Sequence, residues 1–200
     1  MDKAEKIDRA LDALTRVKIA FVRKSDSAEK QVRSCLDCDA HCCQVGFNSM
    51  RVHRIEAEAL RRRLQEDDLR SLIPAIIEKA KSEVRERGLL ENEDANFNCP
   101  LLSDEGRCLV HGPAQPAGCL TFSPVADGGC DHDLAFFAKH VKGIRAAERK
   151  AYGRESEPLP IPVALLRVLR TGRPDPGRPA GPAGDRRGAR SPRKCGGAPE

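Results

Sequence analysis

The chain has 200 residues, with 35 Lys and Arg against 30 Asp and Glu, nine Cys and no Trp. Its net charge of +5 is uneven, because residues 171–200 carry a net charge of +4 and the remainder is close to neutral. This distribution argues against a folded domain built around nucleic acid, and no apolar run approaches the roughly 20 residues that cross a bilayer. We therefore expect a cytoplasmic protein without a secretory leader or membrane contact, in which clustered thiols bind metal.

Two helices are predicted on either side of the first cysteine-rich stretch. The first covers residues 2–32, where charged residues separate apolar residues at helical spacing. Residues 50–53 are either a short extended segment or the lead-in to a second helix over residues 54–64. The apolar face of the first helix is predicted to consist of Ile7, Leu11, Leu14, Val17 and Phe21.

The clearest helical pattern runs from residue 68 to residue 87, and Gly88 follows at the position of a C-terminal cap. Pro74 fits this pattern only if the helix starts near residue 71 or 72, because the first turn needs no amide donors. The predicted apolar face of this helix is Leu69, Leu72, Ile73, Ile76, Ala80 and Val84.

The second half of the chain begins with residues 91–130, which are rich in Gly, Pro, Asn and Asp. Leu101–Leu102 and Leu109–Val110 flank a turn sequence that contains Gly106, which predicts a small hairpin. A helix is predicted over residues 131–152, and its N-terminus is favoured by Asp131 and Asp133. Its predicted inner face is Leu134, Phe137, Val141 and Ile144, and a last short helix should cover residues 162–170.

These elements predict a mainly α protein, in which a small helical domain frames a cysteine-rich metal-binding centre with a short β-hairpin. The predicted organisation is an N-terminal helix over 1–34, a cysteine-cluster domain over 35–152, a short C-terminal helix over 153–170 and a tail over 171–200. The tail has seven Gly, six Pro and no large apolar side chain, so we expect it to be disordered.

Eight of the nine cysteines fall into two blocks within the predicted domain. Two cysteines separated by two residues can bind one metal ion, because the turn between them brings both sulfurs toward a common point. Adjacent cysteines point in different directions, so Cys42 and Cys43 are not expected to be two ordinary ligands of one tetrahedral ion. The blocks are Cys35, Cys38, Cys42 and Cys43, and then Cys99, Cys108, Cys119 and Cys130. Two helices join the blocks, and an antiparallel helical pair would bring them together.

The two blocks together resemble the YkgJ-type cysteine-cluster family, described as a zinc- or iron-chelating domain. The resemblance covers roughly residues 35–130, and it implies that all eight block cysteines are chelating positions. Many members of that family carry an Arg-Pro pair before the third cysteine of the second block and an Arg after that cysteine. Here those places hold Gln115-Pro116 and Leu120. Some relatives are described as flagellin lysine N-methylases, but this sequence has no Gly-rich strand–turn–helix segment for S-adenosylmethionine.

The cysteines leave the metal and the role open. Eight thiolates suit two zinc sites of four thiolates each, or a [4Fe–4S] cluster with four cysteines remaining. The spare, unevenly spaced thiols favour iron–sulfur slightly. The leading hypothesis is a metal-binding cysteine-cluster protein. The alternatives are an enzyme related to the lysine N-methylases and an interaction module that zinc stabilises, and a protein partner is compatible with all three.

Other chemically active residues are better explained without a functional role. Three histidines lie near a cysteine, but each is better explained as a solvated or capping residue than as a metal ligand: His41, His111 and His132. His53 and His140 are predicted to be ordinary surface or helix residues. The Arg61–Arg63 run has acidic residues around it and fits a solvated helix face. Cys195 is expected to be an unpaired thiol, and the tail is expected to bind nucleic acid weakly at most. Catalysis by Cys119 with His111 explains a cluster of thiols less well than metal binding does.

Overall fold

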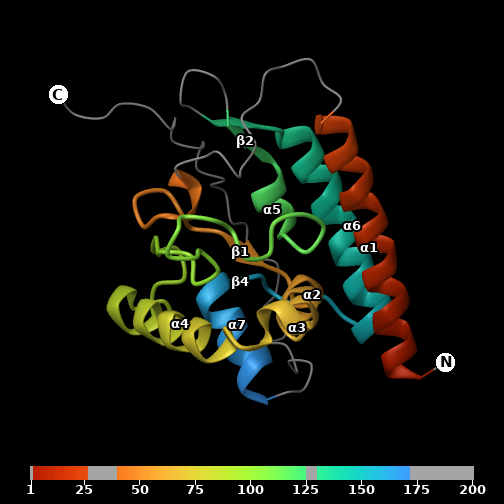
Figure 1. Ribbon diagram of the computed structural model, residues 1–200. Helices are drawn as coiled ribbons and strands as arrows, with labels where there is room; N and C mark the ends of the chain where they lie inside the picture. The colour runs from red at the N-terminus through yellow and green to blue at the C-terminus, as the bar shows by residue number, and fades with distance from the viewer. Residues whose placement is uncertain (1, 27–39, 125–129, 172–200) are drawn as a thin grey trace.

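A computed structural model describes the chain except for residues 1, 27–39, 125–129 and 172–200, and it is mainly helical (Figure 1). Its α-helices are α1 (Lys3–Asp26), α2 (Arg54–Leu64), α3 (Asp67–Arg70), α4 (Ile73–Arg87), α5 (Ala117–Leu120), α6 (Leu134–Tyr152) and α7 (Ile161–Thr171). A single 3-10 turn spans His41–Cys43, and the strands are β1 (Arg51–Val52), β2 (Phe122–Pro124), β3 (Cys130–His132) and β4 (Leu159–Pro160). No helix in the described part is long and apolar enough to cross a membrane. The predicted 171–200 tail and residues 27–34 of the predicted N-terminal segment lie outside the described residues, apart from Thr171.

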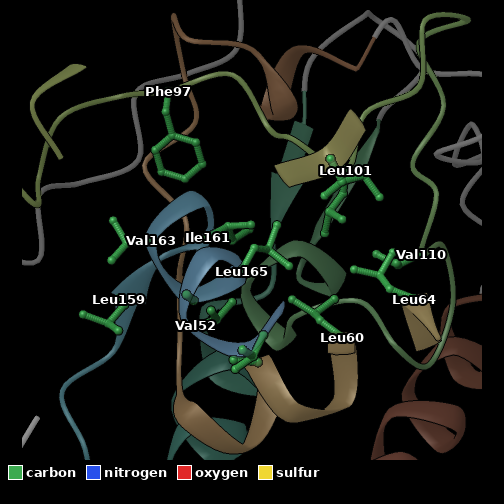
Figure 2. Packing of buried hydrophobic residues seen from close by; sticks show 14 of the residues in the cluster. Val52, Leu60, Leu64, Phe97, Leu101, Val110, Leu159, Ile161, Val163 and Leu165 are labelled. Carbon is green, nitrogen blue, oxygen red and sulfur yellow. The ribbon is translucent and has the colours of Figure 1, made fainter. Parts of the chain in front are cut away.

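Helix α2 stands between two hydrophobic clusters and takes part in both. Ile55, fully buried, packs with α1 and α6, which run side by side in Figure 1. Leu60 and Leu64, on the opposite side of α2, pack with α7, β1, β4 and the loop that carries Phe97 and Leu101 (Figure 2). Burial of these apolar surfaces is the main favourable contribution to folding. Because one short helix joins the two clusters, its own polar groups must also be satisfied in the interior.

The helix predicted over residues 68–87 is in fact two helices. The chain leaves α3 after Arg70 and enters α4 at Ile73, so that Pro74 lies in the first turn of α4. That position needs no backbone amide donor, as the sequence predicted. Gly88 ends α4 with φ of 59°, the left-handed conformation that glycine adopts without strain. Leu72, expected to be inward, lies in the break between the helices and is exposed.

The helix predicted over 131–152 starts three residues later, at Leu134, and its predicted inner face is right at Ile144 and wrong at Leu134. Residues 130–132 form β3, which pairs with β2, and α6 begins only at Leu134. Asp133 is the N-cap, since its carboxylate accepts a hydrogen bond from the amide of Phe136 at 2.8 Å. Leu134 is 57% exposed, and the buried face of α6 is His140, Ile144, Ala147, Glu148 and Ala151.

Short strands and one turn complete the fold. Residues 51–52 are extended, and β1 pairs with β4 just before α7, which begins one residue earlier than predicted. The predicted hairpin is present as a turn with one antiparallel bridge, between Leu102 and Cys108. Within that turn Gly106 has φ of 75°, which a residue with a side chain adopts only with strain.

A fully buried carboxylate, that of Glu148 on α6, ties the start of α2 to the loop that follows α6. Its oxygens accept hydrogen bonds from the amide of Ile55 at 3.2 Å and from the amide and hydroxyl of Ser156, both at 2.9 Å. The imidazole Nδ1 of His53 lies 3.7 Å from the same carboxylate. Burial favours the neutral acid, but the His53 contact and the Ser156 hydrogen bonds outweigh it and lower the pKa of Glu148 below its ordinary value.

We therefore expect Glu148 to contribute to acid unfolding. A carboxyl whose pKa is lower in the folded chain stabilises the fold above its unfolded pKa, and this contribution disappears as the pH falls through the folded pKa. The Glu148→Gln variant should lose about 2 kcal/mol of unfolding free energy at neutral pH, because buried donors lose their charged acceptor. It should also show a shallower fall in stability between about pH 5 and pH 3 than the natural chain.

Urea unfolding at a series of pH values measures both effects. The matched control is Glu78→Gln, which changes an exposed glutamate on α4. If Glu148→Gln and the natural chain lose stability in parallel below pH 5, the assigned role of this carboxylate is wrong.

Candidate metal centre

The two cysteine blocks meet in the folded chain. Cys42 and Cys43 lie in the 3-10 turn, and the amide of Cys99 donates a hydrogen bond to the carbonyl of Cys43 at 2.8 Å. The amide of Phe97 donates to the carbonyl of Asn48 at 2.9 Å, so a second backbone contact continues the pairing. The chain between these segments forms α2, α3 and α4, which return it to the first block.

Asn98, directly before Cys99, fixes the two blocks against α4. Its side-chain carbonyl accepts a hydrogen bond from the amide of Val45 at 3.0 Å, and its side-chain amide donates to Glu83 at 2.9 Å. The backbone amide of Asn98 donates to the same carboxylate at 2.9 Å. One asparagine and one largely buried glutamate therefore hold the segment after the first block beside the start of the second.

The remaining described block cysteines come from the segment after Cys99. Cys108 is the bridge residue of the turn opposite Leu102, and Cys119 lies in α5. All five described block cysteines are half-buried thiols, and Cys99, Cys108 and Cys119 pack against the larger hydrophobic cluster. Their sulfurs therefore line the boundary between the core and the two loops.

The five thiols interact with one another. Cys43 interacts electrostatically with Cys42, Cys99, Cys108 and Cys119, so the thiols from both blocks lie close enough to affect one another. The contact with Cys43 and burial raise the pKa of the Cys42 thiol. Although Cys42 acts to lower the pKa of Cys43, the contact with Cys99 and burial raise it overall.

The same crowding affects Cys119. Burial raises the pKa of this thiol, and the nearby Cys43, Cys108, Cys42 and Glu56 add to the effect. A second thiolate placed close to a first is unfavourable in a medium of low dielectric constant. A bound cation with an affinity for sulfur would remove that penalty, so the donor chemistry fits zinc or iron.

The thiols are not arranged as a finished site. Within residues 2–26, 40–124 and 130–171, no three His, Cys, Asp or Glu side chains are arranged to hold a metal ion as they stand. Cys35 and Cys38 of the first block, and Cys195, lie outside the described residues. Cys130 lies in β3, paired with Pro124, but its side chain is outside the description. The structure thus brings five of the eight predicted positions to one region and leaves the rest of the set untested.

A buried ion pair supports the segment that leads into α5, the helix that carries Cys119, and the sequence analysis did not predict it. Lys18 on α1 is 2% exposed, lies 3.5 Å from Glu56, and donates a hydrogen bond to the carbonyl of Gln115 at 2.6 Å. The same Glu56 oxygen accepts a hydrogen bond from the amide of Ala117 at 2.7 Å. The sequence does contain a signal for the burial of Lys18, because this residue follows Leu14 by four positions and so lies on the apolar face of the helix. Val17, assigned to that face, is 49% exposed.

The histidines and the arginine run can now be placed. His41 makes an edge contact with Phe47, and His111 is exposed, while the side chain of His132 is outside the description. His140 is a helix residue, as predicted, since it lies in α6, but it and His53, the N-cap of α2, are both buried, so neither is a surface residue. His140 stacks on Phe136, and burial, with Lys18 nearby, lowers its pKa.

Each of the three consecutive arginines of α2 is paired with a carboxylate. Arg61 and Arg62 both bind Glu58, and Arg63 binds Asp68. These pairs agree with the solvated-face interpretation of the arginines, but Glu58 itself is 2% exposed and was not expected to be buried. Burial raises the pKa of Glu58, while the two arginines outweigh it and lower the pKa.

No family model, curated protein or solved structure matches this chain. The resemblance to the YkgJ-type family therefore remains a prediction, carried by the cysteine spacing. The meeting of the two blocks is an independent observation, because it comes from the fold.

Replacing Lys18 tests whether its ion pair with Glu56 stabilises the segment that leads into α5. Lys18→Met keeps most of the side-chain volume but leaves the Glu56 carboxylate buried without its cation, so the unfolding free energy should fall by about 3 kcal/mol. Adding Glu56→Gln should recover part of that loss, since it removes the uncompensated charge and keeps an acceptor for Ala117.

Chemical denaturation of the single and double variants provides the measurement. Lys3→Met changes an exposed lysine on the same helix and should leave stability within about 0.5 kcal/mol. A Lys18→Met protein as stable as the Lys3→Met protein would contradict the role given to the ion pair.

Proposed function

We propose that this chain is a metal-binding cysteine-cluster protein that holds an iron–sulfur cluster or zinc through its two cysteine blocks. The observation that carries the proposal is the hydrogen bond between residues 56 positions apart in the sequence, from the amide of Cys99 to the carbonyl of Cys43, with the two thiols close enough to interact electrostatically. Phe97, Leu101 and Val110 anchor the segment of the second block in the larger hydrophobic cluster, and a metal–thiolate centre would stabilise the cysteine-bearing turns beside it further. The proposed ligand set is Cys35, Cys38, Cys42, Cys43, Cys99, Cys108, Cys119 and Cys130.

The chemistry of the donors restricts the metal. Thiolates favour zinc, iron and iron–sulfur clusters over calcium or magnesium. When bound, zinc would act as a fixed tetrahedral cross-link, and an iron–sulfur cluster would add one-electron redox chemistry. The residues of this chain would supply thiolates, exclude water with the adjoining core and keep the two loops together through Asn98. A reducing cytoplasm suits this proposal, because thiols persist there.

The second candidate is an interaction module whose zinc holds the fold. It is favoured by the packing of Cys99, Cys108 and Cys119 against the larger hydrophobic cluster, since a metal bound there would strengthen that core. In that case metal removal should lower the melting temperature strongly, because a ligand that binds only the folded chain stabilises it by mass action. A related methylase activity is tested separately by calorimetry with S-adenosylmethionine, where absence of heat at millimolar concentration would exclude it.

Anaerobic purification of the full chain, followed by absorption spectra and analysis of metal and inorganic sulfide, tests the proposal. We expect either a brown protein with sulfide or a colourless protein with stoichiometric zinc. Cys43→Ser should remove at least about half of the bound metal, because a thiolate ligand is lost from the centre. Cys195→Ser is the matched control and should change nothing, as this cysteine lies outside both blocks.

Two results would overturn the proposal. One is a natural chain that is folded by circular dichroism and contains neither metal nor sulfide after anaerobic purification. The other is an equal loss of metal from Cys43→Ser and Cys195→Ser, which would mean that binding does not depend on the blocks.

A further inference from the structure

Gln115 is the residue before Pro116, and both ends of its buried side chain are hydrogen-bonded. Its side-chain carbonyl accepts a hydrogen bond from the amide of Gly112 at 3.1 Å. Its side-chain amide nitrogen donates to the sulfur of Cys108, with 3.8 Å between nitrogen and sulfur. The first hydrogen bond fixes the orientation of the amide group, so the N–H remains directed at the sulfur.

The backbone at Gln115 and at Ala117, two residues later, is held from two helices. Lys18 on α1 donates to the carbonyl of Gln115 at 2.6 Å, and Glu56 on α2 accepts from the amide of Ala117 at 2.7 Å. Lys18 and Glu56 are both almost fully buried. A side chain whose backbone is anchored on both sides keeps its position without a further loss of conformational entropy. The fold therefore directs the side-chain amide of Gln115 toward the sulfur of Cys108, and this orientation does not depend on the sulfur.

A neutral amide has a specific effect on a thiolate ligand. It donates a hydrogen bond that withdraws electron density from sulfur and fixes the direction of the remaining lone pairs. Groups that orient metal ligands in this way change metal affinity by about 10- to 100-fold when they are removed.

We propose that Gln115 is a positioning residue for the metal centre: through its amide N–H it holds the sulfur of Cys108 in the orientation that binds metal. Lys18 and Glu56 act on the centre indirectly, because they hold the backbone that carries this amide. The inference rests on the proposed function, and it adds a specific ligand and a specific donor to it.

Gln115→Met tests the inference, since methionine has a similar length and no N–H donor. Titration of the metal-free full chain with Co²⁺, in competition with a chelator, measures affinity, and the sulfur-to-cobalt absorption band reports on the thiolates. We expect the dissociation constant to rise about tenfold and the band to move to lower energy, because the sulfur becomes more electron-rich. Gln65→Met, at an exposed glutamine after α2, should match the natural chain.

A second measurement needs no metal. In the metal-free chain the side-chain amide resonance of Gln115, observed by nuclear magnetic resonance, should move in Cys108→Ala and stay in place in Cys42→Ala. If Gln115→Met does not fold, Gln115→Glu replaces it, because glutamate keeps the acceptor for Gly112 and lacks the donor.

The outcomes separate the inference from the proposed function. A natural chain that binds Co²⁺, with Gln115→Met binding it equally well and showing the same absorption band, overturns the inference and leaves the proposed function standing. A natural chain that binds no Co²⁺ overturns both. If the side-chain amide resonance of Gln115 does not move in Cys108→Ala, the assigned hydrogen bond is wrong, whatever the metal data show.

Discussion

The carboxylate of Glu56 is the point on which the arrangement of this molecule depends. It lies in the interior, 3% exposed, and a charge there is unfavourable unless cations and hydrogen-bond donors surround it. Those partners come from three parts of the chain: Lys18 of α1, the amide of His53 and the amide of Ala117. The hydrogen bonds and the ion pair of this one buried carboxylate therefore fix α1, the start of α2 and the start of α5 relative to one another.

A similar principle governs the cysteine loops. Besides the apolar anchors Phe97 and Leu101, polar contacts from outside fix their positions: Glu83 acts through Asn98 on one side, and Lys18 and Glu56 act through Gln115 and Ala117 on the other. Directional hydrogen bonds specify a geometry that hydrophobic packing alone would leave loose. Ionisation of the thiols is unfavourable there, since neighbouring cysteines and burial raise the pKa of Cys42 and Cys119. A bound cation, as we propose, would remove that penalty.

Helical periodicity predicted most of the fold. The helix over 54–64, the cap at Gly88 and the placement of Pro74 were confirmed, because each depends on local sequence alone. The separate short helix α3 and the late start of α6 were missed; the start of α6 depends on a tertiary contact, the pairing of β2 with β3. The single bridge of the predicted hairpin shows that turn chemistry specifies a bend more reliably than the length of the strands.

The candidate site was predictable in part for a related reason. Cysteine spacing identified the blocks, and the helical return between them predicted that they meet. Cysteine spacing could not predict the supporting residues, because they are polar and partners distant in the sequence determine their burial. These residues are Lys18, Glu56, Asn98 and Gln115. A lysine four residues after Leu14 could have suggested a buried cation, but nothing near it in the sequence indicates Gln115 as its partner.

The pairing of α1 with α6 has a consequence for biosynthesis. Roughly 110 residues separate the end of α1 from the start of α6. Translation at about 5–20 residues per second leaves an interval of the order of ten seconds between the two helices. During that interval the apolar face of α1 (Ile7, Ala10, Leu11 and Leu14) has no α6 to cover it. The face that forms half of this cluster is thus made long before the helix that completes the cluster.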